Sequence, residues 1–174
     1  KEIVGRLGEA VYGIDVDSLE AVVITHIAQK RQKLASAESG TGGLLARRLN
    51  TIQGAQGVYP FGLAAHADRV KVQSLGVPEK LIKKFGPVSD RVAAQMAFGA
   101  MEAGNTDIGL AITGVSGGAS ADGQPNGLFY VAACDKNQAV VRRLSLPSGM
   151  DVNDLREAAV SHALNLVRLI LDYD

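Results

Sequence analysis

The fold of this chain is decided by one stretch, residues 33–49, which reads KLASAESGTGGLLARRL. Positions 33–38 alternate apolar and polar side chains, as a short β-strand does. Glycines break the chain at 40–43, and an apolar helical pattern resumes at 44–49. A strand that enters a helix through a tight glycine turn holds its last side chain at the carboxyl edge of a sheet, where α/β proteins bind ligands. The pattern therefore places Ser39 at a candidate binding edge.

Helical spacing recurs along the rest of the chain. Asp17 is predicted to cap the first helix, because Glu20 stands three residues later in the position of a capping box. Ser89 is predicted to cap a longer helix in the middle of the chain. Together with the apolar spacing, these signals predict helices at 17–32, 44–49, 67–74, 78–85, 89–103 and 152–171.

The strands are predicted from apolar runs. Residues 108–112 form a continuous apolar run, which is typical of a strand covered on both faces. Residues 128–134 and 139–146 are expected to pair antiparallel through a turn at 135–137. The glycine-rich segment 54–65 is expected to be a loop leading into a strand. Strands interleaved with helices predict an α/β fold with a mixed sheet that carries helices on both faces.

The composition narrows the function classes. Among 174 residues, eighteen basic side chains balance eighteen acidic ones, so the chain has no net field to hold nucleic acid or an anionic membrane. The single cysteine, Cys134, excludes an internal disulfide framework and a multi-cysteine zinc site, and its apolar surroundings predict a buried, inert thiol. No apolar stretch approaches the ~18 residues that cross a bilayer. The chain is interpreted as a cytoplasmic protein or, since it opens at Lys1 without a methionine, as a piece of a longer one.

Ser39 is a candidate nucleophile because of its place in the strand–turn–helix pattern. The first N–H groups of a helix have no partners within it, and with the helix dipole they favour a phosphate or the oxyanion of a tetrahedral intermediate. Glycines at 40, 42 and 43 let the backbone approach a substrate closely. The alternative is that Ser39 only caps the helix and the glycines only form a turn, since the segment matches neither G-x-S-x-G nor G-x-x-x-x-G-K-[ST].

A serine nucleophile needs a base, and the candidates are the three histidines and a desolvated lysine. His26 and His162 lie inside predicted helices and are interpreted as structural. His66 and Lys71 follow the strand-like run at the end of segment 54–65. A lysine accepts a proton at neutral pH only when it is buried and close to other positive charge. The alternative is that Lys71 lies on the surface of a helix.

A second polar, glycine-rich turn, TGVSGG at 113–118, also follows a buried strand. Two such turns at one edge of a sheet would form opposite walls of a single pocket. The alternative is a flexible connection that binds no ligand.

The chain also carries a set of short segments whose order is more specific than any one of them. They read AESGTGGLL at 37–45, Lys71 ahead of LGV at 75–77, GPVS at 86–89, AITGVSG at 111–117, QPNG at 124–127, and Gly149 with Arg156. In this order they resemble the CinA C-terminal domain family, the nicotinamide mononucleotide deamidases, over residues 19–171. Residues 2–15 are similar to the linker after an N-terminal nucleotide-binding domain in full-length CinA proteins. Residues 1–15 are therefore expected to be linker, and 16–174 the amidase-like domain.

The resemblance implies a three-layer α/β/α fold, no metal or cofactor, and hydrolysis of the carboxamide of nicotinamide mononucleotide to nicotinic acid mononucleotide and ammonia. It also implies a serine nucleophile that works with a lysine and a tyrosine, and here the serine is Ser39 and the lysine is Lys71. His66 holds the place of the tyrosine, five residues before the lysine, and imidazole can shuttle a proton near neutral pH. The implied substrate contacts are Gly40, Thr41, Gly42 and Gly43 for the oxyanion, and Thr113, Gly114 and Ser116 for the nucleotide.

The chain departs from the family pattern at three places. His66 replaces the tyrosine, Gly40 replaces a cysteine after the nucleophile, and Met150-Asp151 stand where the family often carries Asp-Arg. A second function therefore stays open: a catalytically degenerate domain that binds a nucleotide or a partner without turnover. The partners implied are a pyridine nucleotide and the N-terminal domain of the full-length protein, with no nucleic acid or membrane. A homodimer would fit a small α/β enzyme.

Overall fold

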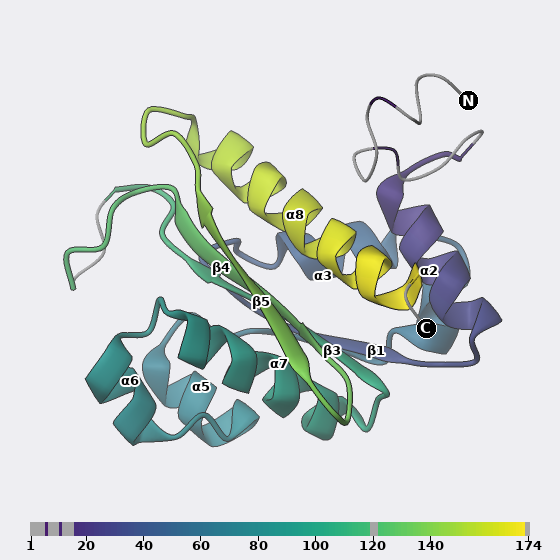
Figure 1. The fold of residues 1–174 in the computed structure, drawn as a ribbon, viewed down its shortest axis with the longest axis horizontal. Coiled ribbons are helices and arrows are strands. Elements are labelled where there is room, and N and C mark those ends of the chain that lie inside the picture. The colour runs from purple at the N-terminus through teal and green to yellow at the C-terminus, as the bar shows by residue number, and fades with distance from the viewer. Residues whose placement is uncertain (1–5, 7–10, 12–15, 119–121, 173–174) are drawn as a thin grey trace.

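In the computed structural model, the chain forms a five-stranded mixed sheet between two layers of helices (Figure 1). The structure describes residues 6, 11, 16–118 and 122–172, so the predicted linker 1–15 lies almost entirely outside the described residues. The strands are β1 (Leu34–Ser39), β2 (Phe61–Ala64), β3 (Ile108–Gly114), β4 (Leu128–Cys134) and β5 (Ala139–Ser145). Their order is β2-β1-β3-β4-β5, with β1 parallel to β2 and β3, and β4 antiparallel to β3 and β5. The predicted mixed sheet is confirmed.

Two hydrophobic clusters hold the layers together, one on each face of the sheet. One face is covered by α2 (Leu19–Gln29), α3 (Leu44–Asn50), α4 (Ala55–Val58) and α8 (Val152–Asp172), and the other by α5 (Asp68–Leu75), α6 (Glu79–Phe85) and α7 (Asp90–Gly104). Side chains of β3 alternate between the faces, so that Leu110 and Ile112 pack in the first cluster and Ala111 packs in the second. No helix within the described ranges is both long and apolar enough to span a bilayer.

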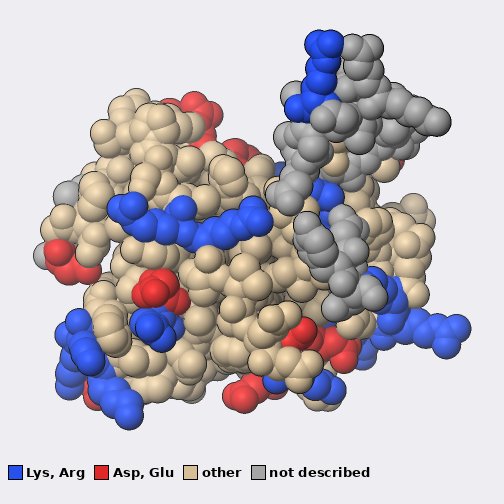
Figure 2. Space-filling view, in the orientation of Figure 1, with Lys and Arg blue, Asp and Glu red and all other residues tan. Residues whose placement is uncertain are grey.

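Charged side chains of both signs occupy the outer surface. Figure 2 shows Lys and Arg side chains and Asp and Glu side chains distributed among uncharged residues on one face of the molecule.

The first helix begins and ends differently from the prediction. Ser18, and not Asp17, is the N-cap, because its hydroxyl accepts a hydrogen bond from the amide three residues later at 3.2 Å. Glu20 does not complete a capping box, since its carboxylate pairs with Arg48 of α3. The helix ends at Gln29, three residues earlier than predicted.

Strand β1 is buried at all six positions although its sequence alternates apolar and polar residues. Parallel neighbours on both sides and helices on both faces exclude water from the strand. Its polar side chains therefore need partners inside the protein. Ser36 Oγ and Tyr59 Oη form a hydrogen bond of 2.6 Å, and Glu38 bonds within the turn that follows the strand.

The remaining predicted elements are present with small shifts of their ends. Ser89 is the N-cap of α7, as predicted. Segment 54–65 was predicted to be a loop that leads into a strand. The strand is β2, but the residues before it form the short helix α4. Cys134 is buried as predicted: it is 1% exposed, and burial raises the pKa of its thiol to about 12. Its thiol therefore stays protonated at neutral pH.

Gly99 allows α5, which carries Lys71, to pack closely against α7. A Cβ at Gly99 would overlap the backbone carbonyl of Leu75, so we expect Gly99→Ala to lower the free energy of unfolding by about 1–3 kcal/mol. Gly57→Ala is the matched control, because Gly57 also lies in a helix and an added methyl there meets nothing within 4 Å. Urea denaturation measures both variants, and equal midpoints would contradict this close packing.

Candidate functional site

The two glycine turns lie side by side at one edge of the sheet. Strands β1 and β3 are parallel neighbours, and Ser39 stands opposite Thr113 near their ends. The turns approach so closely that a Cβ at Gly40 would overlap the backbone carbonyl of Gly114, and Gly40 has a φ of +89°. Only glycine meets both constraints. The structure thus brings together the two turns that the sequence predicts to meet.

A cavity of about 360 Å³ opens where these turns meet, and it is termed the serine cavity. All three predicted catalytic residues, Ser39, His66 and Lys71, line it. The predicted substrate contacts Gly40, Gly114 and Ser116 line it as well. The second turn is therefore part of a cavity wall and more than a bare connection between strands.

Lys71 is a buried residue and not a surface lysine. Its side chain is 2% exposed, and its Nζ donates hydrogen bonds to Asp68 Oδ1 at 2.9 Å and to the backbone carbonyl of His66 at 3.2 Å. The Nζ nitrogen has three positions besides its bond to carbon. Two of them face these acceptors, so one position remains for a proton or a lone pair. The expected burial is present, but the charged neighbour is a carboxylate and not the positive group that the sequence interpretation required.

Ser39 is 8% exposed and does not cap the following helix. The N-cap of α3 is Gly43, which offers no side chain, so the interpretation of Ser39 as only a helix cap is wrong. Within the described residues, Ser39 and Lys71 make no direct hydrogen bond. The two side chains share a cavity without bonding to each other directly.

Glu38 provides the cap that Ser39 does not. Its carboxylate is 1% exposed and accepts hydrogen bonds from the amides of Leu45 and Ala46, each at 3.1 Å. It also accepts a hydrogen bond from the Thr41 hydroxyl at 2.5 Å. These helix amides are already occupied, which corrects the expectation that they face a ligand. The amides of 41–43 have no hydrogen-bond partner in the described part of the chain and remain as donors.

Ser116 fixes the orientation of the peptide that follows Gly40. Its hydroxyl donates to the Gly40 carbonyl at 2.6 Å and accepts a hydrogen bond from Arg156 Nε at 3.1 Å. Since the C=O and N–H of a trans peptide point in opposite directions, this bond also fixes the direction of the Thr41 amide. Ser116 is thus held by the protein on both sides.

Four of the predicted substrate contacts lie outside the serine cavity. Thr113 is fully buried, and its hydroxyl donates to the carbonyl of Pro87 at 2.8 Å, so its side chain is held inside the protein. Thr41, Gly42 and Gly43 line a second cavity of about 460 Å³. The sequence placed all of the predicted contacts in one pocket, whereas the structure divides six of them between two cavities and buries Thr113 outside both.

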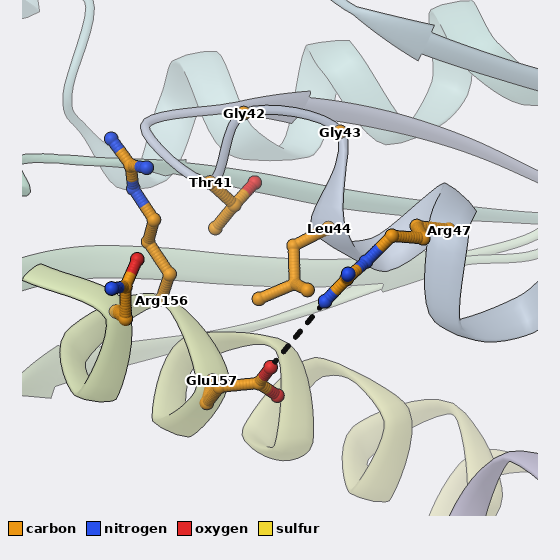
Figure 3. A pocket seen from close by; sticks show the side chains of 8 residues that line it. Thr41, Gly42, Gly43, Leu44, Arg47, Arg156 and Glu157 are labelled. Carbon is orange, nitrogen blue, oxygen red and sulfur yellow. Dashed lines mark ion pairs between the residues drawn. The ribbon is translucent and has the colours of Figure 1, made fainter.

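The second cavity lies between the glycine turn and the start of α8 (Figure 3), and it is termed the arginine cavity. Arg47 of α3 and Arg156 of α8 line it, together with Glu157. Figure 3 shows Arg47 and Glu157 facing each other across it, with 3.9 Å between Nη2 and Oε1. Thr41 lies beside Arg156 in the same view.

Comparison with known proteins decides the family. The model of the CinA C-terminal domain matches residues 16–171. The chain belongs to the CinA C-terminal domain family. The resemblance carried by the ordered segments is thereby confirmed.

Relatives in this family cover nearly the whole chain. The CinA-like protein of Desulfovibrio desulfuricans is 46% identical over 167 residues, which is 94% of this chain, and that of Kosmotoga olearia is 37% identical over 172 residues, which is 98% of it. The chain spans only 39% and 41% of the length of these two relatives.

Solved CinA structures have the same fold. A CinA superfamily protein from Escherichia coli is 28% identical with a TM-score of 0.82. The matched region covers 94% of this chain and 98% of the Escherichia coli chain. The competence/damage inducible protein of Agrobacterium tumefaciens is 30% identical with a TM-score of 0.81, covering 93% and 98%.

The CinA-type site also contains residues that sequence reasoning missed. Asp68 stands three residues before Lys71, a spacing that pairs charges on a helix, so this signal was available in the sequence. Glu38 is different, because no local rule assigns a carboxylate at the end of a strand to amides of the next helix. Arg47 and Glu157 meet only because α3 and α8 pack on the same face of the sheet.

Proposed function

We propose that this domain is an amidohydrolase that converts nicotinamide mononucleotide to nicotinic acid mononucleotide and ammonia, with Ser39 as nucleophile and Lys71 as base. One observation carries the proposal: Ser39 and the buried Lys71 line the same cavity, at the start of a glycine turn whose amides at 41–43 have no partner among the described residues. Membership of the CinA C-terminal domain family supports it.

The first half of the reaction forms an acyl-enzyme. The Ser39 oxygen bonds to the carboxamide carbon while the Lys71 amine accepts the hydroxyl proton. Charge that develops on the carboxamide oxygen is stabilised by amides at the start of the turn, which the Ser116 hydrogen bond to the Gly40 carbonyl orients. The C–N bond then breaks, and the nitrogen leaves as ammonia with the proton that His66 relays from Lys71.

The second half of the reaction regenerates the enzyme. Water gives a proton to the Lys71 amine as its oxygen bonds to the acyl carbon. The bond between that carbon and the Ser39 oxygen then breaks, and the proton returns from Lys71 to Ser39. Nicotinic acid mononucleotide leaves with the water oxygen in its new carboxyl group, which releases its remaining proton to solvent and becomes a carboxylate.

Two features of Lys71 support its role as a base. Burial removes the water that would stabilise its charged form. The Asp68 carboxylate and the His66 carbonyl account for the two N–H groups of a neutral amine, which leaves its lone pair for the Ser39 proton.

One observation favours the second candidate function, binding without turnover. The Asp68 carboxylate, 2.9 Å from Lys71 Nζ, stabilises the ammonium form, which cannot accept a proton. The Asp68 side chain is 51% exposed, however, so water weakens this attraction. We therefore place the amidase first.

The amidase proposal is tested by incubating the 174-residue chain with nicotinamide mononucleotide and measuring both products. We expect nicotinic acid mononucleotide and ammonia to appear in equal amounts, by chromatography and by an ammonia assay. If the wild type and the Ser39→Ala variant are equally silent, the hydrolase proposal is wrong.

The His66→Tyr variant separates the two candidate functions. Calorimetric titration with nicotinamide mononucleotide measures binding, and the product assay measures turnover in the same samples. Under the amidase proposal the wild type both binds and hydrolyses the mononucleotide. Binding without turnover in the wild type, together with turnover in His66→Tyr, would support the binding function instead.

A further inference from the structure

We infer that the arginine cavity is an anion site, and that Arg156 there binds the phosphate of the nucleotide whose carboxamide lies in the serine cavity. This inference rests on the proposed function, because it assigns a place to the second functional group of that substrate. The ligand chemistry required is a phosphomonoester.

Arg156 is held in place while its outer nitrogens stay free. Its Nε donates to Ser116 Oγ at 3.1 Å, whereas Nη1 and Nη2 have no hydrogen-bond partner among the residues that the structure describes. A guanidinium anchored at Nε presents its two outer nitrogens as a rigid pair of donors, which matches the spacing of two phosphate oxygens. The Arg156 side chain is already ordered in the free protein, so ligand binding loses less side-chain entropy there.

The wall opposite this guanidinium is bare backbone. A Cβ at Gly42 would stand 3.8 Å from Arg156 Nη1, and Gly42 has no side chain to fill that space. The amides of Gly42 and Gly43, which have no hydrogen-bond partner in the described part of the chain, border the same cavity, whereas the Thr41 amide is assigned to the carboxamide oxygen. An anion in the cavity therefore meets both the charged pair of donors and backbone donors.

The carboxylate in the cavity is engaged elsewhere. Glu157 Oε2 pairs with Arg48 Nη1 at 3.0 Å, and its Oε1 lies 3.9 Å from Arg47 Nη2. Among the ion pairs of the described residues, none joins Glu157 to Arg156. The two guanidinium groups that line the cavity thus exceed its single carboxylate, and the excess charge is positive.

The serine cavity has the opposite balance. The carboxylates of Asp68 and Asp122 line it with a single lysine, Lys71. Nicotinamide mononucleotide carries a positive pyridinium ring and a negative phosphate, so the two cavities match its two ends in charge. They adjoin at the peptide between Gly40 and Thr41. Binding of the phosphate by Arg156 would therefore orient the carboxamide toward Ser39.

The experiment compares two ligands that differ only in the phosphate. Calorimetric titrations of the Ser39→Ala protein, which leaves the ligand intact, use nicotinamide mononucleotide and nicotinamide riboside. We expect Arg156→Ala to weaken mononucleotide binding by about 10- to 100-fold, because a charge-assisted pair of hydrogen bonds is lost. Binding of the riboside should not change. Inorganic phosphate should compete with the mononucleotide for the protein that keeps Arg156, but not for the Arg156→Ala protein.

Arg143→Ala is the matched control, since Arg143 is an exposed arginine of β5 outside both cavities. It removes the same charge and should leave both affinities unchanged. Equal weakening of both ligands by Arg156→Ala would overturn the inference, because Arg156 would then act through Ser116 and the fold. Absence of any mononucleotide binding would overturn it as well.

The outcomes also separate this inference from the proposed function. If the Ser39-containing protein releases no ammonia but Arg156→Ala still weakens mononucleotide binding selectively, the anion site stands and the amidase proposal fails. If ammonia is released and Arg156→Ala leaves KM unchanged, the amidase proposal stands and the anion site fails.

Discussion

Alanine in place of Ser39 is expected to slow ammonia release from nicotinamide mononucleotide by about 10³-fold or more, because loss of a nucleophile removes the covalent route entirely. Ser39 is 8% exposed at the end of β1, and its Cβ carbon remains in the variant as a methyl group. The fold should therefore be retained. The rate is measured by single-turnover product formation, and binding is measured separately by calorimetry.

Ser36→Ala is the matched control for this prediction. Ser36 lies in the same strand and is fully buried, but its hydroxyl bonds to Tyr59 Oη at 2.6 Å and lines neither cavity. Its loss should lower stability by about 1 kcal/mol and leave turnover in place. A Ser39→Ala protein that is as active as the wild type, or a Ser36→Ala protein that is equally inactive, would contradict the assignment of Ser39.

Removal of the Glu38 carboxylate is expected to have the largest effect on stability. Three donors lose their acceptor in Glu38→Ala: the amides of Leu45 and Ala46 and the hydroxyl of Thr41. Because these groups are largely shielded from water, we expect the free energy of unfolding to fall by about 3 kcal/mol or more. The glycine turn should loosen with the start of α3, so mononucleotide binding should weaken as well.

Urea denaturation and two further variants test this role of Glu38. Glu38→Gln keeps the shape and one acceptor oxygen, so it should recover part of the lost stability. Glu79→Ala removes a carboxylate from α6 that is 68% exposed and pairs with Lys83 at 3.0 Å, and should change stability by no more than about 0.5 kcal/mol. If Glu38→Ala behaves like Glu79→Ala, the carboxylate does not hold the turn.

Local patterns predicted most of the secondary structure. The apolar run 108–112 became the buried strand β3, and Ser89 caps α7 as its position before an apolar helix indicates. The errors have physical causes that lie outside the local sequence. Glu20 fits a capping box but pairs with Arg48, because packing of α2 near α3 offers a charged partner. Segment 54–65 folds partly into α4 where it covers the sheet.

The candidate site was predicted only in part. Ser39 was found because a strand followed by glycines and a helix has a recognisable pattern. Lys71 was found through the family resemblance. It is buried because α5 follows β2, the parallel neighbour of β1, and packs on one face of the sheet. The spacing of Asp68 from Lys71 indicates a charge pair on a helix, but the sequence could not show that this carboxylate is the charged neighbour of a buried amine. Nor could it show that Thr113 turns to Pro87 and away from a ligand.

The sequence by itself determined the turn at 40–43 and the serine before it, because glycine conformation and strand periodicity are properties of neighbouring residues. Tertiary structure alone decided which groups surround that serine. Strand order β2-β1-β3 brings Lys71 and the second turn to the same edge, and the packing of α8 brings Arg156 to Ser116. Such contacts join residues far apart in the chain, and they form only when burial of both sheet faces fixes the positions of the helices.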